Sequence, residues 1–179
     1  MTQKLLAQRE LVITRRLKAP RELVWRTFED PYLLAQWWGP ENFKSVITKL
    51  DFRPSGEWHV TMQAPDGTQI PVRYQFLDIS APQHILYQPL RSEHPYWNGS
   101  PPPSYLAKLT FEASGNETVF TMHAQFESAD DLNVSIQGGF LRGTNEALDK
   151  LEQLAIAPSA GEPTCLDDLS SNLLFSRQR

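Results

Sequence analysis

The sequence contains little cysteine. Cys165 is the single cysteine in 179 residues, so no disulfide can form within the chain and a metal site with two thiolate ligands is excluded. A nucleophilic role for Cys165 is not favoured, because no histidine lies near it in the sequence to activate a thiol. Such sparing use of cysteine is typical of a reducing compartment, and we expect the protein to be cytoplasmic.

Long hydrophobic runs are also missing. No stretch approaches the roughly 18 consecutive apolar residues that a membrane-spanning helix needs. The apolar run near the N-terminus, around Leu5 and Leu6, is too short for the core of a signal peptide. We therefore predict no membrane span and no secretory leader.

Basic residues are not in excess. The formal net charge is -4, whereas a general nucleic-acid binder carries a basic footprint. We expect no nucleic-acid partner. A hydrophobic content of 40% and a charged content of 21% are ordinary for a globular protein, and the length favours one domain.

The usual catalytic and metal-binding motifs are absent as well. No glycine-rich phosphate loop and no nucleophile elbow occurs. Nor does any histidine stand in metal-type spacing with cysteine, aspartate or glutamate, which makes a zinc site improbable on sequence grounds. We predict no catalytic residue, no metal and no cofactor from these patterns. The histidines are His59, His84, His94 and His123.

The most distinctive stretch that is present runs from Asp30 to Pro40 and contains two adjacent tryptophans, Trp37 and Trp38. Pro31 suits the first position of a helix, and Gly39 followed by Pro40 suits its end. Neighbouring helical side chains diverge by about 100°, so the two rings cannot face the same partner. One is expected to anchor the core, with slight preference for Trp37, and the other to border a cavity.

Period-two alternation predicts an antiparallel sheet. A second short helix, beginning near Pro20, is expected between the first two strands. Turns at Pro54–Gly56, Pro65–Gly67 and Gly115–Asn116 separate several of the later segments. The predicted strands are 11–18, 43–52, 57–64, 68–79, 84–89, 104–113 and 117–126.

A long amphipathic helix is predicted over residues 138–155, with Leu148 and Leu151 on its apolar stripe. Glycines 138, 139 and 143 weaken its first turns, and we expect close packing of its backbone against the sheet. Residues 129–137 are expected to be a connection. The segment 91–103 is proline-rich and irregular, either a solvated connector or a lid. The C-terminal tail, residues 156–179, is expected to be disordered or docked on the body or on a second copy in a homodimer.

These motifs together resemble one family. The sequence Ala19–Trp25, the Asp-Pro pair at 30–31, Trp37–Pro40, Asp51–Trp58, Pro65–Thr68 and Glu146–Leu151 occur in the order found in bacterial homologues of the activator of the heat-shock protein 90 ATPase. The resemblance covers roughly residues 9–155, which we take as the domain. It implies an α+β helix-grip fold of the START-like superfamily, in which a curved antiparallel sheet of about seven strands wraps a long C-terminal helix.

The resemblance also implies a pocket between the long helix and the sheet, which would bind a small hydrophobic, amphipathic or aromatic molecule without catalysis. The alternative is a core filled by the same side chains. Relatives often carry Gly-Trp where this chain has Gly143-Thr144. Two other functions stay open: a chaperone partner, through activation of a heat-shock protein 90 ATPase, and an enzyme similar to polyketide cyclases. The candidate ligand-binding residues are Trp25, Trp37, Trp38, Trp58, Val60, Met62, Val72, Tyr74, Phe76, Tyr87, Phe111 and Phe140.

Overall fold

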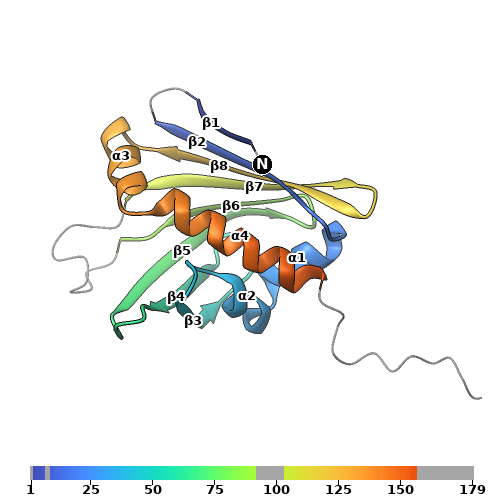
Figure 1. Ribbon diagram of the computed structural model, residues 1–179, viewed down its shortest axis with the longest axis horizontal. Helices are drawn as coiled ribbons and strands as arrows, with labels where there is room; N and C mark the ends of the chain where they lie inside the picture. Colours follow the sequence, from blue (N-terminus) through green and yellow to red (C-terminus); the bar gives the residue numbers. More distant parts are fainter. Residues whose placement is uncertain (1, 7–8, 92–102, 157–179) are drawn as a thin grey trace, which may run out of the picture.

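An antiparallel sheet forms the frame of the structure, and helices cover one of its faces (Figure 1). The computed structural model describes residues 2–6, 9–91 and 103–156, and within these ranges the sheet has eight strands in the order β1-β2-β8-β7-β6-β5-β4-β3. The strands are β1 Thr2–Leu6, β2 Glu10–Leu17, β3 Lys44–Leu50, β4 Glu57–Gln63, β5 Gln69–Ser80, β6 His84–Pro89, β7 Tyr105–Ser114 and β8 Glu117–Phe126.

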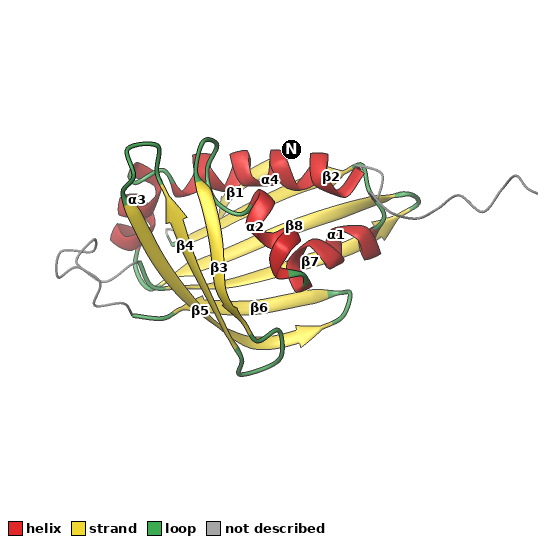
Figure 2. Cartoon of the chain, turned by 90° about the horizontal axis from the view of Figure 1, so that it is seen from below, coloured by secondary structure: helices red, strands yellow, loops and turns green. Residues whose placement is uncertain are grey.

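Helices gather on the concave face of this sheet, as Figure 2 shows. The helix α4 runs across the sheet, with α1 and α2 beside its C-terminal half and α3 at its N-terminal end. The α+β helix-grip architecture predicted from the sequence is confirmed. The helices are α1 Arg21–Glu29, α2 Pro31–Trp37, α3 Ala129–Gln137 and α4 Phe140–Ile156. Within the described ranges, no helix combines the length and hydropathy that crossing a membrane requires.

All seven predicted strands are present, and two elements go beyond the prediction. The polar lead before the first predicted strand forms β1, which pairs with β2 in antiparallel register. Residues 129–137, expected as a connection, form α3, whose N-cap Ser128 accepts a hydrogen bond from the Asp131 amide at 3.1 Å.

The start of the long helix was predicted two residues too early. Gly138 caps α3, and Gly139 has a φ of +90°, which ends one helix and redirects the chain before α4 begins at Phe140. A left-handed conformation of this kind suits glycine because it has no Cβ. The glycine pair therefore separates two helices, whereas the sequence interpretation placed it within one.

The strand β3 departs from regular alternation. A register shift between Ile47 and Lys49 interrupts its pairing with β4. Val46 is consequently 56% exposed, while Ile47 and Leu50 pack against the core. Regular alternation along the predicted strand 43–52 would put Val46 and Leu50 on one face, which is wrong because the extra residue switches the alternation.

The helix α4 approaches the other helices more closely than it approaches the sheet. Its closest backbone neighbours are α1, α2 and α3 rather than any strand. Gly143, expected to allow contact with the sheet, instead faces the loop after α2: a Cβ at this position would lie 3.1 Å from Cγ of Pro40. Large side chains therefore span the distance between α4 and the sheet.

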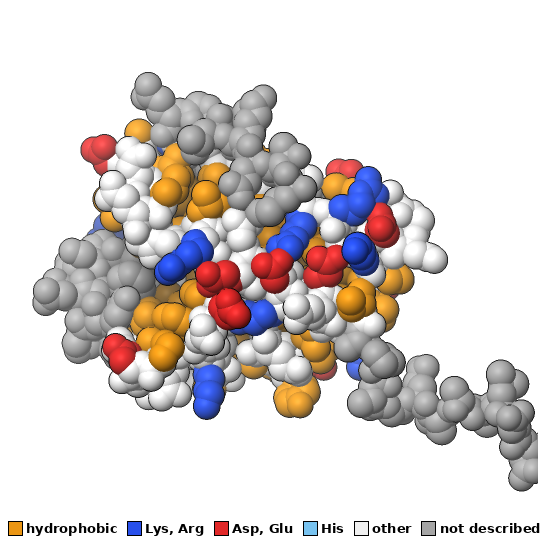
Figure 3. All heavy atoms as spheres, viewed as in Figure 1, with side chains coloured by type: hydrophobic (Ala, Val, Ile, Leu, Met, Phe, Trp, Pro, Cys, Tyr) orange, Lys and Arg blue, Asp and Glu red, His pale blue; other side chains and the backbone are white. Residues whose placement is uncertain are grey.

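Polar contacts hold α4 in this position from both sides. Arg15 on β2 forms an ion pair with Asp149, and Lys150 donates to the carbonyl of Pro40 at 3.2 Å. The amide of Glu41 donates to Glu146 at 2.9 Å. Figure 3 shows acidic and basic side chains intermixed across the middle of this face of the molecule. Partial burial lowers the pKa of Lys150, opposed by the nearby carboxylates of Glu146 and Glu41.

The described ranges omit several predicted features. The lid segment, His94, the C-terminal tail beyond Ile156 and Cys165 all lie outside the described residues.

Candidate functional site

The short helix α2 sets the directions of the two adjacent tryptophans. Its N-cap Asp30 accepts hydrogen bonds from the amides of Tyr32 at 2.8 Å and Leu33 at 3.2 Å, and Pro31 occupies the first turn. The helix ends at Trp37, and Trp38 already has extended backbone dihedrals. The two rings nevertheless stay in edge-on contact, with centroids 5.4 Å apart.

Trp37 is a core anchor. Its side chain is 3% exposed and packs edge-on against Phe28, with ring centroids 4.8 Å apart. Its Nε1 donates to the Thr27 carbonyl at 3.0 Å. In a continuous helix that carbonyl would accept from the amide of residue 31, but Pro31 has no N–H. The indole thus supplies the hydrogen bond that the proline removes.

Trp38 is half-buried and lies over the interior. Its ring meets Trp58 edge-on at a centroid distance of 4.2 Å and Tyr74 at 5.8 Å. Its backbone is fixed because its carbonyl accepts from Ser45 Oγ at 2.8 Å. The slight preference for Trp37 as the inward residue agrees with the burial of the two side chains.

From Trp58 a continuous series of rings crosses the sheet to the start of α4. Neighbouring centroids lie 4.8 Å apart for Trp58 and Tyr74, and 5.3 Å apart for Tyr74 and Tyr87. Tyr105 follows at 6.4 Å from Tyr87 and meets Phe140 at 5.3 Å. These residues come from β4, β5, β6, β7 and α4, so the inner face of the sheet and the first turn of the helix share one aromatic lining.

Three tyrosine hydroxyls gather inside this lining. The Tyr105 hydroxyl lies close enough to those of Tyr74 and Tyr87 for each to affect the pKa of the others. Burial raises the pKa of Tyr74 to about 12, and burial likewise raises the pKa of Tyr87 and of Tyr105. All three phenols are neutral at physiological pH, which makes them hydrogen-bonding groups rather than bases.

One buried donor in this region has no acceptor. Within the part of the chain that the structure describes, the buried side-chain polar atoms without a partner are Nε1 of Trp58 and Oδ1 of Asn145. Trp58 is 2% exposed. The buried polar side chains in the same ranges are those of Thr27, Thr118 and Ser135, which are all uncharged.

The remaining candidate residues fall into two groups. Val60, Met62 and Val72 line the inner faces of β4 and β5 near Trp38, with the Met62 sulfur 3.1 Å from where a Cβ on Gly39 would lie. Trp25 on α1 packs against Phe111 on β7, with ring centroids 5.3 Å apart. Phe76 lies between the two groups, 6.2 Å from Trp58.

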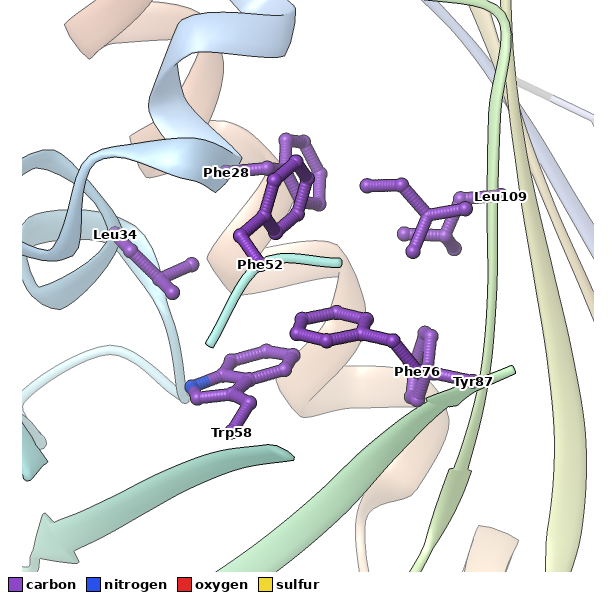
Figure 4. Close-up of a pocket in the computed structure, with 8 residues that line it drawn as sticks. Phe28, Leu34, Phe52, Trp58, Phe76, Tyr87 and Leu109 are labelled. Carbon is purple, nitrogen blue, oxygen red and sulfur yellow. The ribbon is translucent and has the colours of Figure 1, made fainter. Parts of the chain in front are cut away.

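Side chains fill most of the space between these groups. A void of about 10 Å³ remains in the interior, which is room for about one water molecule. Figure 4 shows its rings and aliphatic side chains converging from the helices and the sheet. The twelve candidate residues therefore belong to a packed aromatic interior in this conformation. The void is lined by Phe28, Leu34, Phe52, Trp58, Phe76, Ile85, Tyr87 and Leu109.

A larger hollow of about 230 Å³ opens at one end of β6, β7 and β8. Its polar groups are bonded to each other: Ser104 Oγ donates to Glu127 at 2.8 Å, and Gln125 donates to Glu10 at 3.1 Å. This hollow does not include the candidate residues predicted from the sequence.

The outer face of the sheet carries the described histidines, each beside one carboxylate. His59 lies 2.8 Å from Glu57, and His84 lies 2.6 Å from Asp78. His123 lies 3.2 Å from Glu10. These pairs face away from the aromatic interior, because each histidine alternates with buried neighbours on its strand. Among the residues described, no three His, Cys, Asp or Glu side chains come together in a way that could hold a metal ion.

Sequence interpretation missed several rings of the lining, among them Phe28 and Phe52, which line the void. Tyr105 and Phe126 both contact Phe140, at centroid distances of 5.3 Å and 5.7 Å. The signal was available, because Tyr105 alternates with Ala107 and Leu109 on the inner face of β7.

Comparisons with known proteins place this fold in a family. The family described as Activator of Hsp90 ATPase homolog 1-like protein matches residues 18–155. The chain belongs to this family. No curated protein matches the chain in sequence.

Solved structures of the same fold come from several bacteria. A protein from Arthrobacter aurescens is 25% identical with a TM-score of 0.78, over 88% of this chain and 92% of that one. A crystal structure of a protein from Mycobacterium smegmatis is 23% identical with a TM-score of 0.74, and the match covers 86% of this chain and 96% of that one. A crystal structure of a protein from Nitrosomonas europaea is 24% identical with a TM-score of 0.72, and the match covers 84% of this chain and 96% of that one. The helix-grip domain thus accounts for most of each relative.

Proposed function

We propose that this member of the Activator of Hsp90 ATPase homolog 1-like family binds a small apolar or amphipathic molecule between α4 and the sheet, without catalysing a reaction. One observation carries the proposal. The backbone of α4 makes most of its close contacts with other helices, so that side chains fill the space between α4 and the strands. Space filled by movable rings can be occupied by a ligand once those rings turn.

We propose that the ligand enters where the lining side chains are half-buried. Trp38, Met62, Tyr105 and Phe140 are partly exposed, whereas Trp25 and Trp37 are 4% and 3% exposed. A drug-sized ligand occupies roughly 300–1,000 Å³, far more than the water-sized void. Binding therefore requires outward rotation of the half-buried rings, which then pack against the ligand.

The chemistry of the lining supports binding rather than turnover. The ionisable groups in the lining, Tyr74, Tyr87 and Tyr105, have raised pKa values and stay protonated. A general base works best with a pKa near the working pH. A polyketide cyclase-like reaction would need such a group in the interior, so we favour the binding function.

Native mass spectrometry with a panel of fatty acids and polycyclic aromatic compounds tests this function. We expect at least one bound compound, and no product formation in hydrolase or cyclase assays. Trp38→Ala removes a ring that packs on the ligand and should weaken binding about tenfold. Tyr32→Ala is the control, because Tyr32 on α2 is 75% exposed. If Trp38→Ala and Phe140→Ala both leave the affinity unchanged, the ligand binds elsewhere.

A second candidate follows from the family description itself, which names an activator of the Hsp90 ATPase. In this reading the chain would bind a chaperone and stimulate its ATP hydrolysis. Steady-state ATPase assays with a purified bacterial chaperone of that class decide between the two. Stimulation that persists in Trp38→Ala would favour chaperone activation over ligand binding. A cytoplasmic location and a homodimer remain predictions.

A further inference from the structure

The indole N–H of Trp58 is the least satisfied polar group in the aromatic interior. Two other buried tryptophans have partners: Trp25 Nε1 donates to Glu29 at 3.0 Å, and Trp37 Nε1 donates to the Thr27 carbonyl at 3.0 Å. Among the residues that the structure describes, none accepts from Trp58 Nε1, although its side chain is 2% exposed. Buried tryptophans normally find a partner for this group.

The ring of Trp38 packs against the indole that carries this donor. Its centroid lies 4.2 Å from that of Trp58 at an interplanar angle of 69°, an edge-on contact. Figure 4 shows the Trp58 nitrogen on the side of the indole turned away from Phe76. Since Trp38 is half-buried and its backbone is held by Ser45, its ring can rotate while the loop stays in place. Rotation would expose the N–H to an incoming molecule.

A second set of polar groups lies a short distance along the lining. The Tyr74 ring contacts both Trp58 and Trp38, and its hydroxyl lies close to that of Tyr105. Phenol hydroxyls can donate or accept, whereas the indole can only donate. The lining therefore offers a fixed donor at one point and adaptable hydroxyls at another, between flat aromatic walls.

Resting on the binding function proposed above, we infer that the ligand is a flat, uncharged aromatic molecule with a hydrogen-bond acceptor oxygen, which the Trp58 N–H binds beneath a displaced Trp38. Charge is disfavoured because the buried side chains in the described ranges include no ionic partner. The acceptor is required because the site's donor would otherwise stay unpaired, and such sites discriminate against analogues that lack the complementary group. Trp58 is thus the residue that determines specificity.

Isothermal titration with three naphthalene probes of similar shape tests this inference. Methyl naphthyl ketone carries the acceptor, ethylnaphthalene lacks it, and naphthoate adds a charge. We expect the ketone to bind about tenfold more tightly than ethylnaphthalene, as one hydrogen bond to a buried donor allows, and naphthoate to bind most weakly. In Trp58→Phe the ketone should lose this advantage. Trp25→Phe, the matched control, should keep it.

Proton NMR of the wild-type chain provides a readout that does not depend on folding of a variant. The Trp58 indole proton should move downfield with the ketone and much less with ethylnaphthalene. Equal affinity for the two neutral probes, with no shift of that proton, would overturn the role of Trp58 while leaving the binding function intact. Failure of all three probes to bind would count against the binding function and this inference together.

Discussion

Replacing Trp37 with alanine should destabilise the fold by about 5 kcal/mol. Truncation of a buried tryptophan typically costs about 3–5 kcal/mol. The variant also leaves the Thr27 carbonyl without its donor, because Pro31 cannot supply one, and an unsatisfied buried group costs about 1–3 kcal/mol. Domains of this kind are stable by only about 5–15 kcal/mol, so the variant should be close to unfolding at room temperature.

Two companion variants separate the components of this loss. Trp37→Phe keeps most of the ring but removes the N–H, so it should cost about 1–2 kcal/mol. Trp38→Ala truncates a half-buried ring whose indole makes no comparable bond to α1, and it should cost about 1–2 kcal/mol. Urea denaturation followed by circular dichroism measures all three free energies of unfolding.

The ordering of the variants is the informative result. A loss below about 2 kcal/mol for Trp37→Ala, or equal losses for Trp37→Ala and Trp38→Ala, would refute the division of the pair into a core anchor and a cover.

Three further predictions concern stability. Leu148→Ala and Leu151→Ala should each cost about 2–5 kcal/mol in chemical denaturation, because both side chains are fully buried on α4; losses under about 0.5 kcal/mol would show that the helix face is misassigned. Gly56→Ala should cost more than about 3 kcal/mol, since its Cβ would lie 2.0 Å from the Asp51 carbonyl oxygen, whereas Gly67→Ala, with open space but a positive φ, should cost about 1–2 kcal/mol; a reversed order of denaturation midpoints would contradict this. Stability should fall as the pH rises above about 10, because the pKa of Tyr74 is raised in the folded state and its phenol ionises first in the unfolded chain; the share of the loss due to Tyr74 should reach about 2 kcal/mol by pH 12, and Tyr74→Phe should make the fall less steep, with Tyr87 and Tyr105 causing the rest.

The sequence predicted the fold well for elements that bury one face along their whole length. Leu148 and Leu151 recur at helical spacing, and both prove to be buried on α4. Strands with regular alternation, such as β8, could be placed because a period of two needs no tertiary information.

Elements that depend on single residues were harder to predict. The β3 bulge inserts one residue opposite β4, and nothing in the residue types around Thr48 signals it. The break between α3 and α4 rests on the left-handed conformation of Gly139, whereas glycine inside a helix gives the same sequence pattern. Ser128 followed by Asp131 was a usable cap signal for α3.

The candidate site shows a different limit. Alternation identifies which rings face inward, and most of the lining was found in this way. It does not reveal whether those rings leave a cavity, because packing depends on side-chain rotamers set by distant neighbours. The lone N–H of Trp58 is likewise a property of the packed structure, since it depends on what Trp38 and Tyr74 place beside it.

The central claim is that a ligand lies between α4 and the inner face of the sheet. Intermolecular nuclear Overhauser effects between bound methyl naphthyl ketone and the protein test it directly. The account predicts contacts with the ring protons of Trp38, Tyr105 and Phe140, which border the interior. Contacts confined to the outer face, around Lys108 and His123, would contradict it.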